Sequence, residues 1–301
     1  MIVVVCPAAT VTGGPEALHQ LADSLTRQGF DAAMLYLPGD YHVVPEPYLG
    51  YRFRTVSESE VYPTDVVVIP EVMVGEVRRF AFARPVLWWL SVDNAAGGAL
   101  TACGDHLAQS AYAWRHLADH GHRPLMLSDY THPAFSKVNT VREPWVAVNP
   151  AKGADLMDRF RALCPDIEVR PIEGMGRDEV ATFLNRATVF VDFGHQPGKD
   201  RLPREAASCG AVVFIRDTGA ARFRQDYPLP DEFFFTASDS DLIALGGRIR
   251  TVMADSPPAY GAQVLYHRSI AREQRTFDVQ VNLFASRFTQ EFSWPSAPAP
   301  K

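Results

Sequence analysis

The stretch that decides the fold runs from residue 194 to residue 220 and reads GHQPGKDRLPREAASCGAVVFIRDTGA. An apolar strand at 188–193 leads into it, and Pro203 is expected to open a short helix where a missing N–H costs nothing. Gly210 ends this helix, and 211–215 is a second buried strand. A strand, loop, helix and strand in this order place the loop at the carboxyl edge of a parallel sheet. Ligands of open α/β sheets bind at that edge.

The loop and the helix carry charges that suit an anionic ligand. Lys199 and Arg201 lie beside free backbone N–H groups at the start of the helix, where a diphosphate is the usual ligand. Glu205 has two interpretations: the helix dipole alone favours a carboxylate in a first turn, or the carboxylate accepts two vicinal ribose hydroxyls. Gly219 follows the second strand, and its N–H group could reach a sugar or the phosphates at the same edge.

The first half of the chain also alternates strands and helices. A strand, a helix and a strand over about 35 residues form one βαβ unit, the start of a Rossmann-like sheet. Gly14 in its loop would let the backbone pass close to a ligand at a helix N-terminus, or it simply permits a tight strand-to-helix turn. The expected strands are residues 2–6, 31–37, 65–70, 85–92 and 124–128, and the expected helices are 15–28 and 106–121.

The second half repeats the pattern after a proline-containing linker at 131–144. The chain is therefore predicted to be α/β, with two Rossmann-like lobes facing across a cleft. The first lobe is expected to span 1–135 and the second 145–257. A helix-like segment follows at 258–292, and 293–301 is expected to be a mobile tail. Within the second lobe the expected strands are 145–148, 167–172, 188–193 and 211–215, and the expected helices end near 163 and span 177–186.

Two polar residues directly after strands are candidates for chemistry in the crevice. Asp93 could orient a hydroxyl of an acceptor or a donor sugar, or act as a base; an N-cap or Asx-turn is the structural alternative. His195 could bond a donor sugar or a phosphate, or make a backbone hydrogen bond.

Charge and composition narrow the function classes. The net charge of −6 argues against a nucleic-acid partner. No apolar run approaches the roughly 20 residues that span a bilayer, although a peripheral membrane contact stays possible. Four scattered cysteines are typical of reduced thiols in a cytoplasmic protein. No metal site is expected, because the Asp-Ser-Asp at 239–241 precedes a helix and is interpreted as its start.

The second lobe resembles a known family of enzymes. Leu202, Pro203, Glu205 and Gly210 match, with a spacing one residue shorter, the Leu-Pro-x-x-Glu-Ala-x-Ala-x-Gly helix of retaining, two-lobed (GT-B) glycosyltransferases. These are the enzymes related to glycogen synthase and sucrose synthase, including bacterial family 4-like members. The resemblance implies that Glu205 grips the donor ribose. It also implies that Lys152, in the turn Asn-Pro-Ala-Lys-Gly, contacts the donor diphosphate.

The resemblance implies a metal-independent and retaining enzyme of polysaccharide biosynthesis. It would move a sugar from a nucleotide-diphosphate donor to a glycan, a lipid-linked acceptor or another hydroxyl, with no cofactor besides the nucleotide sugar. The first lobe would take the acceptor and the second the donor, and segment 258–292 would cross back towards the first lobe.

Two positions depart from the family pattern. Pro197 stands at or next to the place of the first of two glutamates, and Ala147 stands where an arginine is common. Lys199, Arg201 or Arg204 would have to supply the lost positive charge. The alternative hypothesis is a non-catalytic nucleotide-binding or sugar-phosphate-binding protein derived from the same fold.

Overall fold

The first lobe is built on a sheet of seven parallel strands in the computed structural model, which describes residues 1–39 and 43–290. Its strands are β1 (Ile2–Pro7), β2 (Ala32–Leu37), β3 (Arg54–Thr55), β4 (Val66–Pro70), β5 (Arg84–Trp89), β6 (Asp105–Ala108) and β7 (Leu125–Met126). They pair in the order β3-β2-β1-β4-β5-β6-β7. In the interior strand β1, Val3 lies opposite Ala33 on one side and Val67 on the other. Both faces of this strand are buried, which is why its sequence is a continuous β-branched run.

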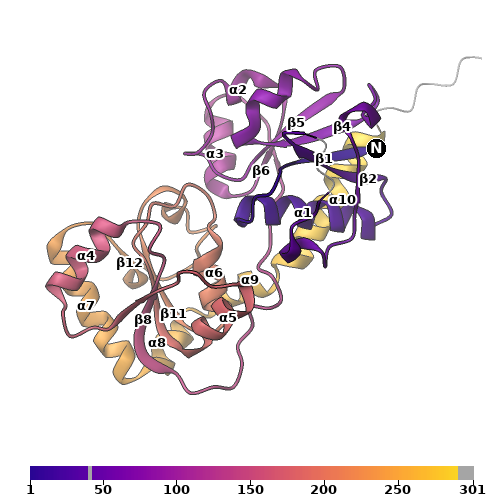
Figure 1. The fold of residues 1–301 in the computed structure, drawn as a ribbon. Coiled ribbons are helices and arrows are strands. Elements are labelled where there is room, and N and C mark those ends of the chain that lie inside the picture. Colours follow the sequence, from indigo (N-terminus) through magenta and orange to yellow (C-terminus); the bar gives the residue numbers. More distant parts are fainter. Residues whose placement is uncertain (40–42, 291–301) are drawn as a thin grey trace, which may run out of the picture.

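Helices cover both faces of this sheet (Figure 1). They are α1 (Gly13–Arg27), α2 (Ala99–Ala102), α3 (Ala111–Asp119) and the 3-10 segments η1 (Glu46–Tyr48), η2 (Glu58–Glu60) and η3 (Glu71–Arg78). The helix predicted at 106–121 was wrong in its first part, because β6 occupies 105–108. Leu107 and Ala108 are fully buried in the sheet, and Ser110 caps α3 by accepting a hydrogen bond from the Ala113 N–H at 3.1 Å.

The second lobe has five parallel strands, in the order β12-β11-β10-β8-β9. These are β8 (Glu143–Val148), β9 (Val169–Pro171), β10 (Ala187–Asp192), β11 (Val212–Arg216) and β12 (Phe234–Phe235). Around them lie α4 (Ala154–Leu163), α5 (Arg177–Arg186), α6 (Arg201–Ser208), α7 (Asp239–Ala254), η4 (Gly219–Arg222) and η5 (Asp231–Phe233). The predicted fold class, α/β with two Rossmann-like lobes facing across a cleft, is confirmed.

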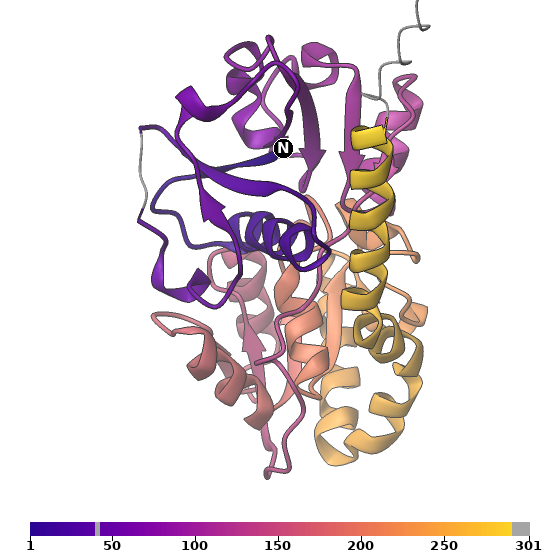
Figure 2. The same ribbon diagram turned by 90° about the vertical axis from the view of Figure 1, so that its right-hand side faces the viewer.

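The end of the chain forms three helices, α8 (Ser256–Ala262), α9 (Val264–Ala271) and α10 (Glu273–Gln290). Tyr266 and Ile270 of α9 belong to the core of the second lobe, whereas Phe277 and Phe284 of α10 belong to the core of the first. Figure 2 shows α10 on the outside of the molecule, reaching from one lobe to the other. Residues 291–292 of the expected segment and the expected tail at 293–301 lie outside the described residues.

None of the helices in the described part of the chain combines the length and the apolar character that crossing a membrane requires.

Candidate functional site

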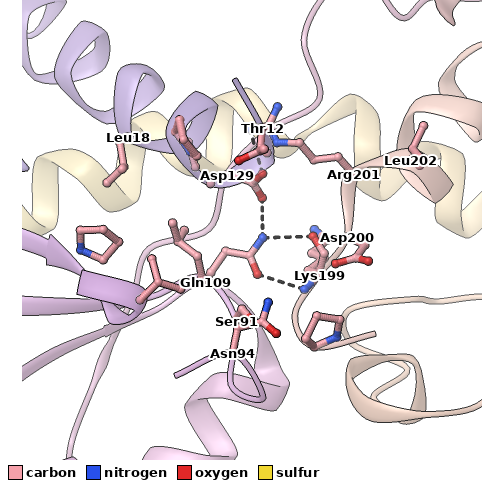
Figure 3. A pocket seen from close by; sticks show the side chains of 18 of the residues that line it. Thr12, Leu18, Ser91, Asn94, Gln109, Asp129, Lys199, Asp200, Arg201 and Leu202 are labelled. Carbon is pink, nitrogen blue, oxygen red and sulfur yellow. Dashed lines mark hydrogen bonds and ion pairs between the residues drawn. The ribbon is translucent and has the colours of Figure 1, made fainter. Parts of the chain in front are cut away.

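The carboxyl ends of the two sheets meet at a cleft of about 630 Å³ (Figure 3). This volume lies within the range of small-molecule sites. The first lobe contributes the β1–α1 loop and the ends of β4 and β5, and the second contributes the β8–α4 turn and the segment that starts α6. Polar and glycine residues of the lining are Thr10, Thr12, Gly13, Gly14, Glu71, Ser91, Asn94, Gln109, Asp129, Asn149, Lys152, Asp192, Lys199, Asp200, Arg201 and Glu205.

The structure places the predicted site residues in two groups. Five of them, from both lobes, line the cleft: Gly14, Lys152, Lys199, Arg201 and Glu205. The other three, Asp93, His195 and Gly219, lie outside that lining.

Helix α6 begins two residues earlier than expected. Asp200 is its N-cap and Arg201 its first residue, so Pro203 is the third residue rather than the opening one. A proline is tolerated there because the first N–H groups of a helix have no intrahelical partner. Glu205 is therefore the fifth residue, beyond the first turn, and the interpretation that it merely complements the helix dipole in the first turn is wrong.

Glu205 carries a buried carboxyl group at the edge of the cleft. Burial raises the pKa of this carboxyl group to about 7, although the neighbouring Arg201 and Arg204 lower it. Within residues 1–39 and 43–290, no hydrogen bond or ion pair engages this carboxylate. The group is therefore available to accept hydroxyl donors from a ligand.

The cations of the cleft are each held by an acid. Lys199 Nζ lies 2.7 Å from Glu273 Oε1, and an Arg201 guanidinium nitrogen lies 3.1 Å from Asp129 Oδ2. Lys152 is paired with Asp200 and keeps 35% of its side chain exposed, against 13% for Lys199 and 11% for Arg201. Lys152 is thus the most accessible of the three cations.

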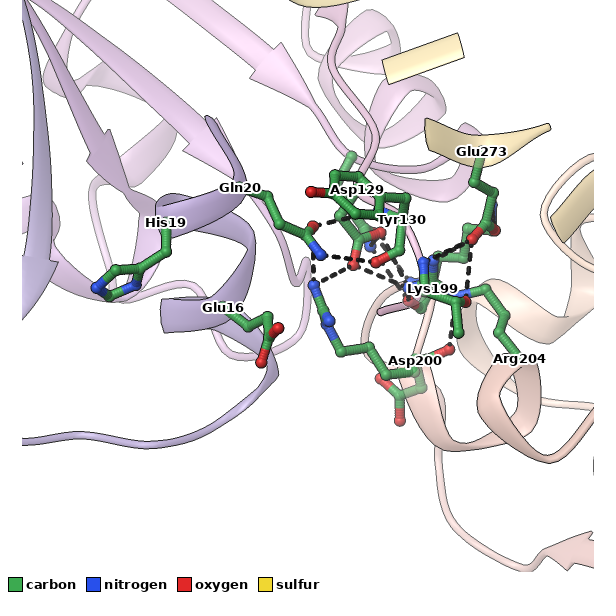
Figure 4. Close-up of polar contacts among 12 residues, drawn as sticks. Glu16, His19, Gln20, Asp129, Tyr130, Lys199, Asp200, Arg204 and Glu273 are labelled. Atoms are coloured by element: carbon green, nitrogen blue, oxygen red, sulfur yellow. Dashed lines mark hydrogen bonds and ion pairs between the residues drawn. The ribbon is translucent and has the colours of Figure 1, made fainter. Parts of the chain in front are cut away.

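Arg204 lies behind the cleft at the centre of a buried network (Figure 4). One of its nitrogens donates to both oxygens of Asp129 at 2.9 Å, and another donates to Glu273 Oε2 at 3.0 Å. Burial opposes ionisation of Asp129, but Arg204 and Arg201 outweigh it and hold its pKa well below the ordinary range. The network joins α6 to the segment after β7 and to the first residue of α10. Arg204 itself is fully buried and is not part of the cleft lining.

Gln109, which follows β6, connects this network to the first lobe (Figure 3). Its amide nitrogen donates to Asp129 Oδ1 at 2.8 Å and to the Lys199 carbonyl at 3.1 Å. Its amide oxygen accepts from the Lys199 N–H at 3.1 Å. Gln109, Asp129 and Glu273 could not be identified from the sequence, because none belongs to a motif and each acts through a partner far away in the chain.

The turn that carries Lys152 depends on glycine. Gly153 has a φ of +68°, and a Cβ there would lie 2.4 Å from the Phe193 carbonyl oxygen. This close approach holds Lys152 beside Asp200, whose burial raises its pKa to about 6 while Lys152 opposes that shift. Asp192 lies close by at the end of β10, and burial raises its pKa too.

Backbone contacts join the two lobes beside the cleft. The Val92 N–H donates to the Pro197 carbonyl at 2.7 Å. A Cβ at Gly198 would lie 2.2 Å from the Leu90 carbonyl oxygen, so glycine is needed for this approach. The segment around Pro197, where the resemblance implies a first glutamate, is thus occupied by a contact between the lobes.

Asp93 and His195 meet at an exposed seam between the lobes. His195 Nε2 lies 2.6 Å from Asp93 Oδ2, and His195 Nδ1 lies 2.8 Å from Thr218 Oγ1. The Tyr112 hydroxyl donates to Asp93 Oδ1 at 2.9 Å. Gly219 lies behind them, where a Cβ would come within 2.0 Å of the Gln196 carbonyl oxygen. Both proposed polar residues are therefore bonded to protein groups.

Two buried polar atoms of the cleft lack a protein partner among the described residues. Ser91 Oγ and Arg201 Nε are buried, and neither has a hydrogen-bond partner among the described residues. Glu71 accepts from the Leu90 N–H at 2.9 Å, and burial raises its pKa to about 7. Unpaired buried polar atoms are costly, so their presence in a cleft indicates a place for a polar ligand.

Across the described ranges 1–39 and 43–290, no group of three or more His, Cys, Asp or Glu side chains is arranged to hold a metal ion.

Two facing Rossmann-like lobes, with a cleft at the carboxyl ends of both sheets, define the GT-B fold of glycosyltransferases, as the resemblance implied. No family model matches the chain, and no curated protein matches it by sequence.

Similarity to known proteins is found instead among solved structures. HepE from Anabaena, solved with UDP and with UDP-glucose, is similar with a TM-score of 0.71 at 13% and 14% identity, over 95% of this chain and 99% of that one. Sucrose-phosphate synthase from Thermosynechococcus elongatus has a TM-score of 0.66 at 15% identity, over 97% and 99% of the two chains. WaaG, a glycosyltransferase involved in lipopolysaccharide biosynthesis, has a TM-score of 0.61 at 10% identity, over 96% and 100%. At these identities the likeness shows the fold.

Proposed function

We propose that the protein is a glycosyltransferase that moves a sugar from a nucleotide-diphosphate donor to a hydroxyl group of a glycan or lipid-linked acceptor. One observation carries the proposal: Glu205 borders the cleft without a hydrogen-bond or ion-pair partner among the described residues, while Lys152 and Arg201 line the same cleft. A carboxylate that accepts two ribose hydroxyls next to cations that neutralise a diphosphate matches the chemistry of such a donor. UDP and UDP-glucose are bound by HepE, which has the same fold.

The second lobe is assigned to the donor and the first lobe to the acceptor. Lys152 is the first contact for the diphosphate, because it is the most exposed cation and stands at the start of α4. Its partner Asp200 has a pKa of about 6, so this carboxylate is readily neutralised when a phosphate takes over Lys152. Lys199 and Arg201 add positive charge deeper in the cleft, and Gly14 and Gly219 are assigned to backbone contacts with the donor.

The reaction breaks the bond between the anomeric carbon and the diphosphate oxygen and forms a bond from that carbon to the acceptor oxygen. The electron pair of the broken bond stays on the diphosphate, where Lys152, Lys199 and Arg201 stabilise it without a metal ion. The acceptor proton is lost to a base, and Asp93 and His195 are assigned to acceptor or sugar contacts at the seam. The resemblance assigns retention of configuration, and the four free cysteines agree with a cytoplasmic location.

A screen of UDP-, GDP- and dTDP-sugars for transfer and for slow donor hydrolysis tests this function. We expect one donor to be turned over, and Lys152→Ala to lower the rate at least tenfold through lost charge stabilisation. Glu232→Gln, which changes an exposed carboxylate outside the cleft lining, serves as the control variant. Turnover of every donor at the rate of buffer alone would contradict the proposal.

The alternative is a binding protein without turnover. Pro197 favours it, because the position of the missing glutamate is used for the contact with Val92. Tight binding of a nucleotide sugar together with no transfer and no hydrolysis would support this alternative.

A further inference from the structure

Helix α10 presents an exposed stripe of arginine and apolar side chains. The stripe consists of Arg275, Val279, Leu283 and Arg287, whose spacing of four residues puts them on one face of the helix, together with Arg272 in the turn just before it. Val279 is 55% exposed and Leu283 63% exposed, and the arginines are exposed as well. The opposite face of α10 is packed into the core of the first lobe. Figure 2 shows that α10 lies on the outside of the molecule.

The charge of the stripe is not neutralised by the protein. No ion pair engages Arg272, Arg275 or Arg287 within the part of the chain that the structure describes; Arg287 lies over the Phe288 ring, 5.8 Å from its centroid. The two acidic residues of α10 are bound to residues outside the stripe. Glu273 bonds to Lys199 and Arg204, and Asp278 accepts from Arg27 at 2.9 Å and from Ser24 at 2.6 Å. A face that was merely solvated would be expected to intersperse acids with its bases.

A shallow hollow of about 670 Å³ borders the stripe on the side of α1. Gln274, Arg275, Asn282 and the acid Asp278, which is paired with Arg27, line it, and Gln28 of the α1 C-cap closes it. The amide nitrogens of Gln28 and Asn282 already donate to protein oxygens. The Gln274 amide and the Arg275 guanidinium group are suitable donors to a phosphodiester. The hollow thus places phosphate-binding groups directly beside Val279 and Leu283.

We propose that this stripe binds the surface of an anionic lipid bilayer, with its arginines on the headgroups and with Val279 and Leu283 in the interface. The argument is charge complementarity: the chain as a whole carries a net charge of −6, yet this face is positive and interleaved with exposed apolar groups. Helices that lie in a membrane interface combine basic and apolar side chains in this way. A small soluble anion would engage the arginines but would leave the apolar positions without a partner. The site is separate from the cleft and does not depend on the function proposed for it.

Co-sedimentation with vesicles tests the proposal on the full chain. We expect binding to vesicles of equal parts phosphatidylcholine and phosphatidylglycerol, little binding to phosphatidylcholine alone, and weaker binding at high salt. Each arginine near an anionic surface contributes about a fivefold factor, so the combined variant Arg272→Gln, Arg275→Gln and Arg287→Gln should bind roughly 100-fold more weakly.

The matched control removes the same charge from other faces: Arg52→Gln, Arg78→Gln and Arg123→Gln, three exposed arginines of the first lobe. This variant should bind vesicles nearly as well as the unaltered protein. Leu283→Ser should weaken binding without a change in charge. Equal binding by the stripe and control variants would overturn the proposal, and so would the absence of binding to anionic vesicles. Self-association that the stripe variant abolishes, without vesicle binding, would assign the stripe to a second copy and also overturn it.

Discussion

Glu205 keeps its carboxyl group in a position where ionisation is unfavourable without a ligand. Its ordinary pKa of 4.5 is raised to about 7 by burial, despite two nearby arginines. Ribose hydroxyls that donate to the carboxylate would favour its ionised form and lower this pKa. The folded protein therefore gives up stability at Glu205 as the pH rises through about 7, and a bound nucleotide would restore it.

This leads to a pH-dependent affinity. We expect the affinity for a nucleotide-diphosphate sugar such as UDP-glucose to fall roughly tenfold between about pH 8 and about pH 6, because Glu205 becomes protonated over that range. The diphosphate diester keeps its charge between these pH values, so the change in affinity comes from a titrating group of the protein. Calorimetry at several pH values measures it. Glu205→Gln should bind weakly with a flat profile; an unchanged slope in this variant would instead point to Glu71 or Asp200.

At the scale of single residues, the sequence predicted residues that line the cleft, but not the buried residues that hold them in place. Lys152 and Glu205 could be predicted to lie near one edge of the second sheet, and Gly14 at the corresponding edge of the first, because each lies in a segment that follows a strand and parallel strands end together. Asp129 and Glu273 could not, because their roles come from burial against Arg204, which lies 75 and 69 positions away in the chain. The pairing of Asp93 with His195 likewise depends on how the lobes meet.

At the scale of elements, α10 stabilises the lobe that it reaches. Phe284 is 1% exposed within the first core, whereas the adjacent Leu283 is 63% exposed. We expect Phe284→Ala to lower the free energy of unfolding by about 3–5 kcal/mol, the usual cost of removing a buried aromatic ring. Leu283→Ala should change it by less than about 0.5 kcal/mol. Urea denaturation followed by circular dichroism compares the two variants, and equal losses would show that α10 does not pack as described.

Helices and strands could be predicted where the spacing of apolar residues was clear. The predictions failed where that spacing was not clear. The α5 helix at Arg177–Arg186 was predicted with its observed bounds, and the buried strands came from β-branched runs. The short strand β6 was mistaken for part of a helix, because four residues, three of them buried, are too few to show a periodicity of their own. The segment after residue 257 contains helix breaks near 263 and 272, and neither a proline nor a strong capping residue indicates them in the sequence.

At the scale of the whole molecule, the two-lobed fold followed from the repeated alternation of strands and helices. The distance between the lobes could not be predicted in this way, because it is set by contacts between residues far apart in the chain. Gly198 against Leu90, Val92 against Pro197 and Lys199 against Glu273 hold the lobes together around the cleft. These contacts position donor groups and first-lobe groups within one cavity.

Gly198→Ala should therefore disturb the approach of the lobes. A Cβ there would lie 2.2 Å from a backbone carbonyl that cannot move cheaply, so we expect the segment at 194–200 to shift. Misplacement on this scale should reduce the transfer rate roughly 10- to 100-fold and increase the radius of gyration in solution scattering. Gly97→Ala is the control, since a Cβ there meets nothing within 4 Å. Equal activity of the two variants would show that the contact has no role in the reaction.

Isothermal titration calorimetry with UDP, GDP and dTDP tests the central claim most directly. The account predicts that at least one of these nucleotides binds the unaltered protein, and that Glu205→Ala weakens it by at least about 2 kcal/mol through the lost bonds to the ribose. Lys152→Ala should weaken the diphosphate but leave the corresponding nucleoside unaffected. Absence of binding by all three nucleotides, or an affinity unchanged in Glu205→Ala, would contradict the assignment of this cleft to a nucleotide-diphosphate donor.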